Sequence, residues 1–514
     1  MTRRACAGPL VVVGDCLLDR DLVGRASRLS PDAPIPVLED VVEHERPGGA
    51  GLAALLAARD GHDVVLLTAL GDDAAGARLR DLLADRVTIV DLGLKGPTPQ
   101  KVRVRSAGQS LVRLDHGGIA SRVGAAGPEV DRLLGRADTV LVSDYGRGLP
   151  TGHLRGILAA LAGRVPLVWD PHPRGAAPAR GAWLVTPNLA EVDHFARLLD
   201  PAPGPVAGPR EPGLRAAGPL GAALSGGGPL GRTGRAAARL VGGWQVQAVA
   251  ATMGAAGALL SYGDGTPLVV PAPAVVAADS CGAGDCFAAS AAGLLRSGAT
   301  TSEAVVGAVA AAAAFVAAGG AGSVVMKSGR GDGDGIGHRC VTRDRAGGAL
   351  HAAVELARAT RARGGTVVAT GGCFDLLHAG HVGMLRAARG LGDCLVVCVN
   401  SDASVRRLKG GDRPLVPEGD RVRVLSELGC VDAVVVFDED TPEAVLGELR
   451  PHVWAKGGDY AGAKLPEARV LAEWDGQAVL LPYLDGRSTT DLLARIEGRR
   501  RFDVSRTAAR EEMA

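Results

Sequence analysis

Short runs of Val, Leu and Ile recur along the chain, and each is followed by a turn and then by a helical pattern. Examples are LVVVGD, TVLVSDYG, PLVWDPH and QAVAATMG. Continuous apolar runs that end in Gly, Asp or Asn are typical of parallel strands in a sheet covered on both faces. Their alternation with helices predicts a doubly wound α/β fold, in which ligands bind at the carboxyl ends of the strands.

A chain of 514 residues is too long for one compact domain, and a fresh series of strand patterns begins with GTVVATGGCFD. We therefore expect a first domain over 1–328, a linker with one helix over 329–363, a second α/β domain over 364–498 and a tail over 499–514. Between about 201 and 235 the composition changes to Pro, Gly and Ala, which predicts a mobile insertion within the first domain.

Composition narrows the class of protein. Lys and Arg number 57 against 56 Asp and Glu, and aromatic residues make up 3%, so neither nucleic acid nor a membrane is an expected partner. Nine cysteines without a CxxC pair indicate neither a disulfide framework nor a zinc site, which favours a reducing, cytoplasmic location. The apolar segment Ala304 to Ala318 is too short to span a bilayer and predicts a buried helix.

The stretch GAGD, Gly282 to Asp285, opens the helical pattern CFAASAAGLLRSG. Glycines at the start of a helix leave backbone N–H groups that point at one spot, where the helix dipole favours an anion. A sugar hydroxyl must lose its proton when it attacks phosphorus, and a carboxylate such as Asp285 can accept that proton. The alternative is an ordinary helix start with an acidic first turn.

This stretch and several others resemble the ribokinase and phosphofructokinase-B family of sugar kinases over about residues 8–328. The family signature D-T-x-G-A-G-D is represented by DSCGAGD, and further matches are GGAG, TPNLAEV and TMGAAG. The resemblance implies a ribokinase-like doubly wound sheet with a small β lid. It also implies that ATP is a substrate and that the reaction needs Mg²⁺, with a monovalent cation as a further possibility and no direct protein ligand to a metal.

The same resemblance assigns roles to particular residues of the first domain. Asp285 is the implied base, and the implied anion hole consists of Gly282, Ala283 and Gly284. The glycine pair near the sugar is Gly48 and Gly49. Residues implied at the nucleotide, its phosphates and Mg²⁺ are Asn188, Glu191, Thr252, Gly254 and Gly257.

A narrower resemblance connects GDCLLDRDLVGRASRLSPDAPIPV, TPQKVRVRSAGQSLVRLD and VSDYGRGLP with the heptose 7-phosphate kinase branch. It implies that Asp15 and Asp144 bind the sugar. Candidate cations for a phosphate on the sugar are Lys101, Arg103 and Arg113, although a solvated strand face with alternating charge remains the alternative. The stretch from Lys101 is also a candidate lid hairpin through which such kinases pair, so a homodimer is expected.

One position departs from the family pattern. Members usually have GGAANVA, with an asparagine that contacts the sugar, whereas this chain has GGAGLAA with Leu52 at that position. A leucine cannot make the hydrogen bond on which specificity often depends. The departure leaves open a different sugar phosphate as the substrate of the first domain.

The stretch FDLLHAGHVGML places His378 and His381 between a strand pattern and a helix pattern. Gly380 permits close approach of backbone to a ligand. Metal ligation and capping or core histidines are alternatives, but the strand-to-helix turn favours phosphate binding. A phosphate nucleophile is already ionised and needs no base, so donors and cations that neutralise developing charge are the groups required.

The second half resembles the nucleotidyltransferase superfamily with the HxGH motif over about residues 364–497, and within it the adenylyltransferase that activates heptose 1-phosphate. The resemblance implies His378, His381 and Lys409 as catalytic residues. Residues implied at the nucleotide are Phe374, Asp375, Gly380, Lys456, Asp459, Ser488, Thr489 and Thr490. The last three would cap a helix against the triphosphate.

Together the two resemblances imply a bifunctional enzyme of ADP-heptose synthesis, with ATP and sugar phosphates as its small-molecule partners. The first reaction would phosphorylate D-glycero-D-manno-heptose 7-phosphate at O1, and the second would transfer an adenylyl group to heptose 1-phosphate. A separate heptose bisphosphate phosphatase would act between them. The alternatives are the same architecture with another sugar, or an active second half with the first half as a binding module.

Overall fold

A computed structural model describes residues 8–107, 109–117, 122–199, 228–275, 279–324, 349–458 and 465–482. The chain forms two compact units. The first unit comprises Met1–Arg210, Thr233–Asp264 and Ala272–Asp332. The second comprises Glu211–Arg232, Gly265–Pro271 and Gly333–Ala514. Among the described residues, no helix is both long enough and apolar enough to cross a bilayer.

The first unit is built on a mainly parallel sheet in the order β14-β13-β12-β11-β10-β1-β4-β5. Its strands are β1 (Leu10–Gly14), β4 (Val64–Thr68), β5 (Thr88–Asp91), β10 (Thr139–Ser143), β11 (Leu167–Asp170), β12 (Leu184–Val185), β13 (Val249–Thr252) and β14 (Ala258–Ser261). Only the β13–β14 pair is antiparallel among these described strands. β1, β4 and β10 are buried at every position, as continuous apolar runs predict for a sheet covered on both faces.

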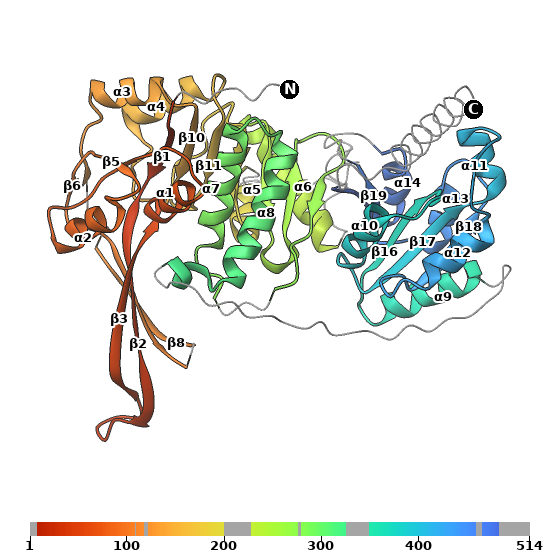
Figure 1. Ribbon diagram of the computed structural model, residues 1–514, viewed down its shortest axis with the longest axis horizontal. Coiled ribbons are helices and arrows are strands. Elements are labelled where there is room, and N and C mark those ends of the chain that lie inside the picture. Colours follow the sequence, from red (N-terminus) through yellow and green to blue (C-terminus); the bar gives the residue numbers. More distant parts are fainter. Residues whose placement is uncertain are drawn as a thin grey trace, which may run out of the picture. The chain divides into compact units, whose positions relative to one another are not determined.

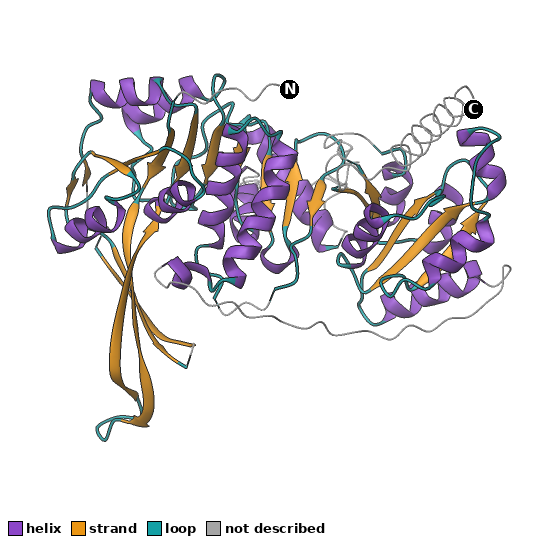
Figure 2. Ribbon diagram, in the orientation of Figure 1, coloured by secondary structure: helices purple, strands orange, loops and turns teal. Residues whose placement is uncertain are grey.

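Helices cover the sheet of the first unit (Figure 2). They are α1 (Ala50–Arg59), α2 (Ala74–Leu83), α3 (Pro128–Gly135), α4 (Gly152–Leu161), α5 (Leu189–Leu199), α6 (Pro229–Trp244), α7 (Ala283–Arg296) and α8 (Thr301–Ala317), with short 3₁₀ turns η2 (Gly254–Ala256) and η3 (Gly320–Val324). α7 contacts α1, α8, β10 and β11, and its small residues from Ala288 to Ala292 are buried. α8 confirms the predicted apolar helix and begins with a capping box between Thr300 and Glu303.

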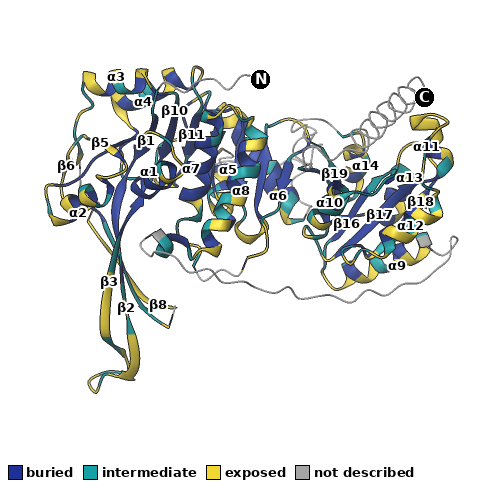
Figure 3. Cartoon of the chain, viewed as in Figure 1, coloured by how far each residue is buried: buried dark blue, intermediate teal, exposed yellow. Residues whose placement is uncertain are grey.

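A four-stranded lid projects from this sheet as a long ribbon (Figure 1). Its strands are β2 (Cys16–Leu29), β3 (Pro36–Gly49), β7 (Gln100–Ser106) and β8 (Gln109–His116), in the order β3-β2-β7-β8. β7 and β8 form the antiparallel hairpin predicted from the alternating stretch. Figure 3 shows that the strands of the main sheet are buried whereas much of the lid is exposed. A separate small sheet pairs β6 (Leu94–Lys95) with β9 (Arg122–Val123).

The second unit is a parallel α/β sheet in the order β18-β17-β16-β19-β20, with the short β15 beside β20. Its strands are β15 (Leu268–Val270), β16 (Val367–Gly372), β17 (Cys394–Asn400), β18 (Ala433–Phe437), β19 (Val453–Gly457) and β20 (Gln477–Leu481). Its helices are α9 (Ala349–Ala362), α10 (Ala379–Arg389), α11 (Asp402–Lys409), α12 (Glu418–Ser426), α13 (Glu443–Leu449) and α14 (Ala468–Leu471), with the turn η4 (Ala472–Trp474). β17 is buried at all its positions and runs through the centre of the core.

The predicted α/β class with a small β lid and a second Rossmann-like domain is confirmed. One local expectation needs correction. Residues 229–235, expected within the Pro/Gly-rich insertion, form the start of α6, because the sequence that follows buries Ala237, Leu240 and Trp244 as one helical face. The rest of the predicted insertion, 201–227, lies outside the described residues, as does the predicted tail.

Candidate active sites

The predicted anion hole stands where the 279–282 turn meets α7. Gly282 precedes the helix with φ of 80°, a left-handed conformation that glycine adopts without strain. The N–H of Ala283 donates to the Ser280 carbonyl at 3.2 Å. In the described residues no acceptor is found for the N–H of Gly284, so this amide is the better placed of the two for a phosphate.

Asp285 lies in the first turn of α7 and is buried, with 7% of its surface exposed. Burial raises the pKa of this carboxyl to about 7, although the hydroxyl of Tyr145 hydrogen-bonds to it and opposes the rise. The Tyr145 hydroxyl donates to Asp285 Oδ1 at 2.8 Å. A carboxyl that ionises near neutral pH can accept a proton from a hydroxyl with more driving force than an ordinary aspartate.

The two aspartates predicted to bind the sugar lie at neighbouring strand ends. Asp15 follows β1 and Asp144 follows β10, and these strands pair with Gly14 opposite Ser143. Asp15 accepts the N–H groups of Tyr145 and Arg147, both at 3.1 Å, and burial raises the pKa of its carboxyl.

Asp144 accepts the N–H groups of Gly146 and Ala176, and burial together with the charge of Asp15 raises its pKa to about 6. The structure therefore brings Asp15, Asp144 and Asp285 to one end of the sheet.

The predicted glycine pair stands at the end of β3, directly before α1. Gly49 has φ of 61°, and a Cβ on it would lie 2.6 Å from the Asp15 carbonyl oxygen and 3.3 Å from the Tyr145 ring. A Cβ on Gly48 would lie 2.7 Å from Asp19 Oδ2. Gly49 thus needs to be glycine because its φ is positive and its backbone closely approaches the predicted sugar-binding Asp15, whereas Gly48 is crowded by side chains of β2.

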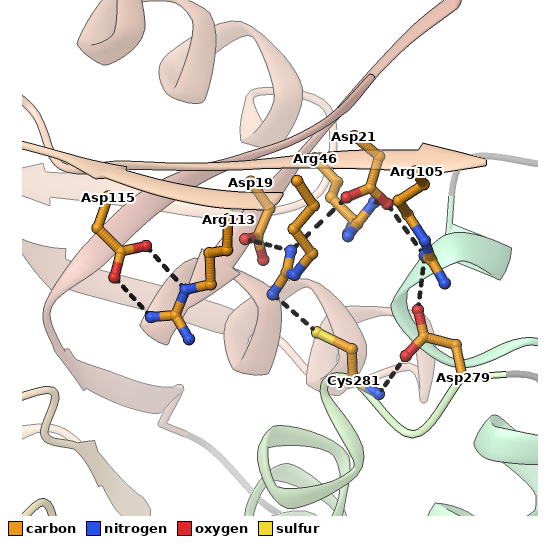
Figure 4. Close-up of polar contacts among 9 residues, drawn as sticks. Asp19, Asp21, Arg46, Arg105, Arg113, Asp115, Asp279 and Cys281 are labelled. Carbon is orange, nitrogen blue, oxygen red and sulfur yellow. Dashed lines mark hydrogen bonds and ion pairs between the residues drawn. The ribbon is translucent and has the colours of Figure 1, made fainter. Parts of the chain in front are cut away.

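The lid contributes arginines that already have carboxylate partners (Figure 4). Arg103 donates to Asp19 Oδ1 at 2.9 Å and to the sulfur of Cys281 at 3.2 Å. Arg113 forms an exposed two-bond pair with Asp115 on the same strand. Lys101 lies opposite Asp19 in the lid register. Burial raises the pKa of Asp285, and the charge of Lys101 opposes that rise.

A second layer of lid contacts was not anticipated from the sequence. Arg105 donates to Asp279 Oδ2 at 2.8 Å, and Asp279 in turn accepts the N–H of Cys281, directly before the anion hole (Figure 4). Arg46 donates to the buried carboxylate of Asp21 at 2.8 Å. The Arg105–Asp279 pair connects the lid to the turn that precedes α7, whereas the Arg46–Asp21 pair joins β3 to β2 within the lid. Alternating charge was the available signal, but it does not specify partners.

The residues predicted near the nucleotide fall at neighbouring strand and helix ends. Asn188 forms a parallel bridge with Thr252, and it exchanges hydrogen bonds with Glu191 at the start of α5. Gly254 and Gly257 have φ of 59° and 93° around the turn η2. No group of three His, Cys, Asp or Glu side chains suited to hold a metal occurs among the described residues.

In the second unit, His378 and His381 lie at the start of α10 with ring centroids 4.0 Å apart. His378 caps the helix, since its Nδ1 accepts the N–H of Gly380 at 3.1 Å. Burial, with the charges of His378 and Lys409, lowers the pKa of His381 to about 4. Phe374 packs against His381 at 5.5 Å between centroids. The structure thus brings together Phe374, Gly380 and the two predicted catalytic histidines. The third predicted catalytic residue, Lys409, ends α11.

Asp375 proves to hold a loop. Its Oδ1 accepts the N–H groups of Leu415 and Val416 at 2.7 and 3.0 Å, and its Oδ2 pairs with Arg413. Both oxygens are therefore engaged within the protein. The loop that Asp375 holds joins α11, which ends at Lys409, to α12.

Arg421 is a buried anchor that sequence reasoning missed. Its guanidinium has no exposed surface and donates to the carbonyls of Cys373, Asn400 and Val416 and to Asp402. It thereby joins the ends of β16 and β17. No motif around Arg421 distinguishes it from an exposed helical arginine.

The remaining predicted contacts lie farther along the chain. Lys456, at the end of β19, pairs with Glu467 at 2.7 Å. Asp459, Ser488, Thr489 and Thr490 lie outside the described residues, so their predicted roles stay predictions.

Comparisons with known proteins agree with this architecture. Residues 231–327 match the family model described as pfkB family carbohydrate kinase, and residues 369–509 match the one described as cytidylyltransferase-like. Among solved structures, phosphofructokinase-2 from Escherichia coli is 19% identical, with a TM-score of 0.45, and the match covers 61% of this chain and 96% of that one. The two family models define a carbohydrate kinase and a nucleotidyltransferase in one chain.

Curated relatives show the family. The bifunctional protein HldE of Streptomyces coelicolor is 58% identical over 96% of this chain and 98% of its own length. The HldE proteins of Azorhizobium caulinodans and Geotalea uraniireducens are 37% and 34% identical, each over 95% of this chain and over 98% and 95% of their own lengths. The chain belongs to the bifunctional HldE family. The predicted combination of kinase and nucleotidyltransferase is confirmed.

Proposed function

We propose that the first unit transfers the γ-phosphoryl group of ATP to O1 of D-glycero-D-manno-heptose 7-phosphate. The second unit then transfers an adenylyl group from ATP to heptose 1-phosphate, which gives ADP-heptose and pyrophosphate. Membership of the HldE family and the two sets of sequence motifs support this assignment. One observation carries it: the buried carboxyl of Asp285 at the start of α7 accepts a hydrogen bond from Tyr145, whose backbone N–H holds the strand-end Asp15.

In the kinase reaction, Asp285 accepts the proton of the sugar O1 as this oxygen attacks the γ-phosphorus. Asp15 and Asp144 hold sugar hydroxyls, and both are fixed by backbone N–H groups. The Gly284 amide and the positive end of the α7 dipole stabilise the charge on the transferred group. Lys101 is the lid cation best placed to approach the sugar phosphate, since Arg103 and Arg113 already pair with carboxylates.

In the transferase reaction, the sugar phosphate is itself the nucleophile, so no base is required. His378, His381 and Lys409 neutralise charge at the α-phosphorus and on the departing pyrophosphate. Asp375 and Arg421 act through the backbone, because they fix the loop after α11 and the ends of β16 and β17. Ser488 to Thr490 would cap a helix toward the triphosphate.

Mg²⁺ fits both sites as a partner of the phosphates. It is commonly held by substrate phosphates and water with one or two protein groups, and the described residues contain no all-protein cage. When bound, it neutralises phosphate charge. Glu191 and Asn188 would help to hold the Mg²⁺ beside the phosphates, and burial raises the pKa of Glu191. A monovalent cation near the kinase site stays a prediction.

We further propose that the protein is a homodimer joined through the lid. The lid exposes eight large apolar side chains, namely Val23, Leu29, Ile35, Val41, Val42, Leu111, Val112 and Leu114. A sheet with an exposed edge strand and so many uncovered apolar residues is typical of an interaction surface. The proposed location is the cytoplasm.

The product of the first reaction carries two phosphates, whereas the second reaction starts from a sugar with one. A separate phosphatase that removes the 7-phosphate is therefore needed between them.

The direct test is to incubate the purified chain with ATP, Mg²⁺ and heptose 7-phosphate and to identify products by mass. We expect the 1,7-bisphosphate alone, and ADP-heptose once a heptose bisphosphate phosphatase is added. A panel of other sugar phosphates tests the alternative raised by Leu52. Turnover of another sugar with none of heptose 7-phosphate would overturn the proposed first reaction.

A further inference from the structure

Tyr145 contacts both the proposed base, Asp285, and the proposed sugar-binding residue Asp15. It follows Asp144 after β10, and its phenolic hydroxyl donates to Asp285 Oδ1 at 2.8 Å. Its backbone N–H donates to Asp15 Oδ2 at 3.1 Å. Among the described residues, it is the one side chain that hydrogen-bonds to the carboxyl of Asp285.

The phenol is confined on several sides. A Cβ on Gly49 would lie 3.3 Å from its Cε2 atom, and the ring of His172 stacks on it at 6.4 Å between centroids and an interplanar angle of 21°. Burial and the charge of Asp285 raise the pKa of Tyr145 well above its ordinary range. The hydroxyl therefore keeps its proton and acts toward the carboxylate as a donor.

A donor to one carboxylate oxygen has two consequences for a base. It fixes the plane of the carboxyl group, so that the second oxygen is left to receive the substrate proton. It also favours the ionised form, because a hydrogen bond to a carboxylate stabilises the charge. Without this bond, burial would leave Asp285 protonated at a pH where the kinase must work.

We propose that Tyr145 is a positioning residue of the kinase, which orients and ionises the base Asp285 through its hydroxyl while its backbone amide fixes the sugar-binding Asp15. The inference rests on the proposed role of Asp285. Because both contacts start from one residue, the base and the sugar-binding carboxylate keep a fixed spacing. Other ionisable groups that bear on Asp285 are Asp19 on β2, Lys101 on β7 and Asp170 at the end of β11.

The test is Tyr145→Phe in the full chain, with kcat and KM of the kinase measured across pH. Loss of a hydrogen bond to a charged group predicts a kcat about 10–100-fold lower at pH 7. The apparent pKa in kcat/KM should rise by about one unit, so the deficit shrinks at higher pH. The KM for the sugar phosphate should change little, because the backbone amide that holds Asp15 remains.

Tyr262→Phe is the matched control. Tyr262 is a half-buried phenol near the start of α8, and its hydroxyl interacts with Thr301 and Ser302. We expect its kinase pH profile to match that of the unaltered chain. Both variants should retain nucleotidyltransferase activity. A uniform loss of kcat in Tyr145→Phe without displacement of the apparent pKa would indicate a packing role and overturn the proposal.

Asp285→Asn separates the two proposals. If Tyr145 acts through Asp285, Tyr145→Phe should lower kcat no further in the Asp285→Asn background. Full kinase turnover by Asp285→Asn would overturn the base and the inference together. If Asp285→Asn is inactive but Tyr145→Phe keeps an unaltered pH profile, the base is supported and only the inference about Tyr145 is overturned.

A second probe does not depend on Tyr145→Phe folding. Uniform 3-fluorotyrosine in a chain with four tyrosines makes the phenol a stronger donor without loss of the ring. The apparent pKa in kcat/KM should then fall, whereas Tyr145→Phe should raise it. An unchanged apparent pKa would contradict the proposal.

Discussion

Leu52 packs directly against Gly282: a Cβ on Gly282 would lie 2.7 Å from Leu52 Cδ2. Leu52 is 1% exposed and lies in α1, whereas Gly282 precedes α7. The residue that departs from the sugar-kinase pattern therefore supports the turn that forms the anion hole. An apolar side chain suits this place because it packs without an unsatisfied polar group.

This contact predicts that Gly282→Ala is costly. The added Cβ meets Leu52, and φ of 80° strains any residue with a Cβ by about 1–2 kcal/mol. We expect a lower unfolding temperature for the first unit and a kinase rate reduced at least about 10-fold. The control for stability alone is Gly284→Ala, whose Cβ meets no atom within 4 Å, because the Gly284 amide belongs to the proposed anion hole. Equal stability of the two variants would contradict the expectation.

Asp285→Asn should separate activity from stability. Removal of the base should lower the kinase rate by about 10²–10⁴-fold and leave the nucleotidyltransferase unchanged. Folding favours the protonated form, since the pKa of Asp285 is about 7 in the folded protein against 3.8 ordinarily. The free energy of unfolding therefore decreases as pH rises from about 4 to 7, because ionising the buried carboxyl is unfavourable in the folded protein.

Asp285→Asn should accordingly be more stable than the unaltered chain above pH 7, by a few kcal/mol at most. Its amide oxygen can still accept the hydrogen bond from Tyr145. Thermal unfolding at pH 5 and pH 8 measures the difference, which should vanish toward low pH. Activity of the unaltered kinase should fall about tenfold per pH unit below pH 7.

His381 should take up a proton when ATP binds. In the free protein its pKa is about 4, so it is neutral at pH 7, and a nearby triphosphate favours the charged form. The calorimetric binding enthalpy should then depend on the ionisation enthalpy of the buffer. His381→Asn should reduce that dependence and lower transferase activity about 10²-fold with the kinase unchanged. An unaltered buffer dependence in the variant would contradict this role.

His381 also affects stability with pH. Its pKa in the folded protein lies below the unfolded value of 6.5, so its contribution is present above pH 6.5. That contribution is lost as pH falls toward about 4. The second unit should therefore unfold more readily at pH 4 than at pH 7, and less so in His381→Asn.

Asp375→Asn tests the loop anchor of the second unit. An amide can still accept an N–H, but it loses the ion pair with Arg413 and the stronger charged hydrogen bonds to Leu415 and Val416. We expect a transferase kcat/KM about 10–100-fold lower, with the kinase unaffected. Asp440→Asn, which removes an exposed pair with Arg407, is the control and should change little.

The lid surface makes an oligomerisation prediction. Val42→Lys places a charge in the exposed apolar surface of the lid and should turn a dimer into a monomer in sedimentation experiments. Val424→Lys, at a comparably exposed site in the second unit, should leave the oligomeric state unchanged. A monomeric unaltered chain would contradict the proposed dimer.

Sequence by itself determined the order of strands and helices, the two kinds of chemistry and the glycines of the turns. Those features are local: apolar runs bounded by Gly and Asp specify strands, and GAGD or HAGH specify helix starts suited to phosphate. The same reasoning placed Asp15, Asp144 and Asp285 at strand and helix ends, which parallel pairing then gathered at one edge.

Tertiary structure alone decided which groups meet. Tyr145 and Asp285 are 140 residues apart, and no sequence pattern near either residue predicts that they are in contact. Arg103 was a candidate for a phosphate, but packing of the lid gives it Asp19, and Asp375 turns toward a loop 40 residues away. The two-residue period of a strand determines which face a charged side chain occupies. Its partner depends on which strands and turns pack against that face. That choice is made by the long-range burial of the sheets.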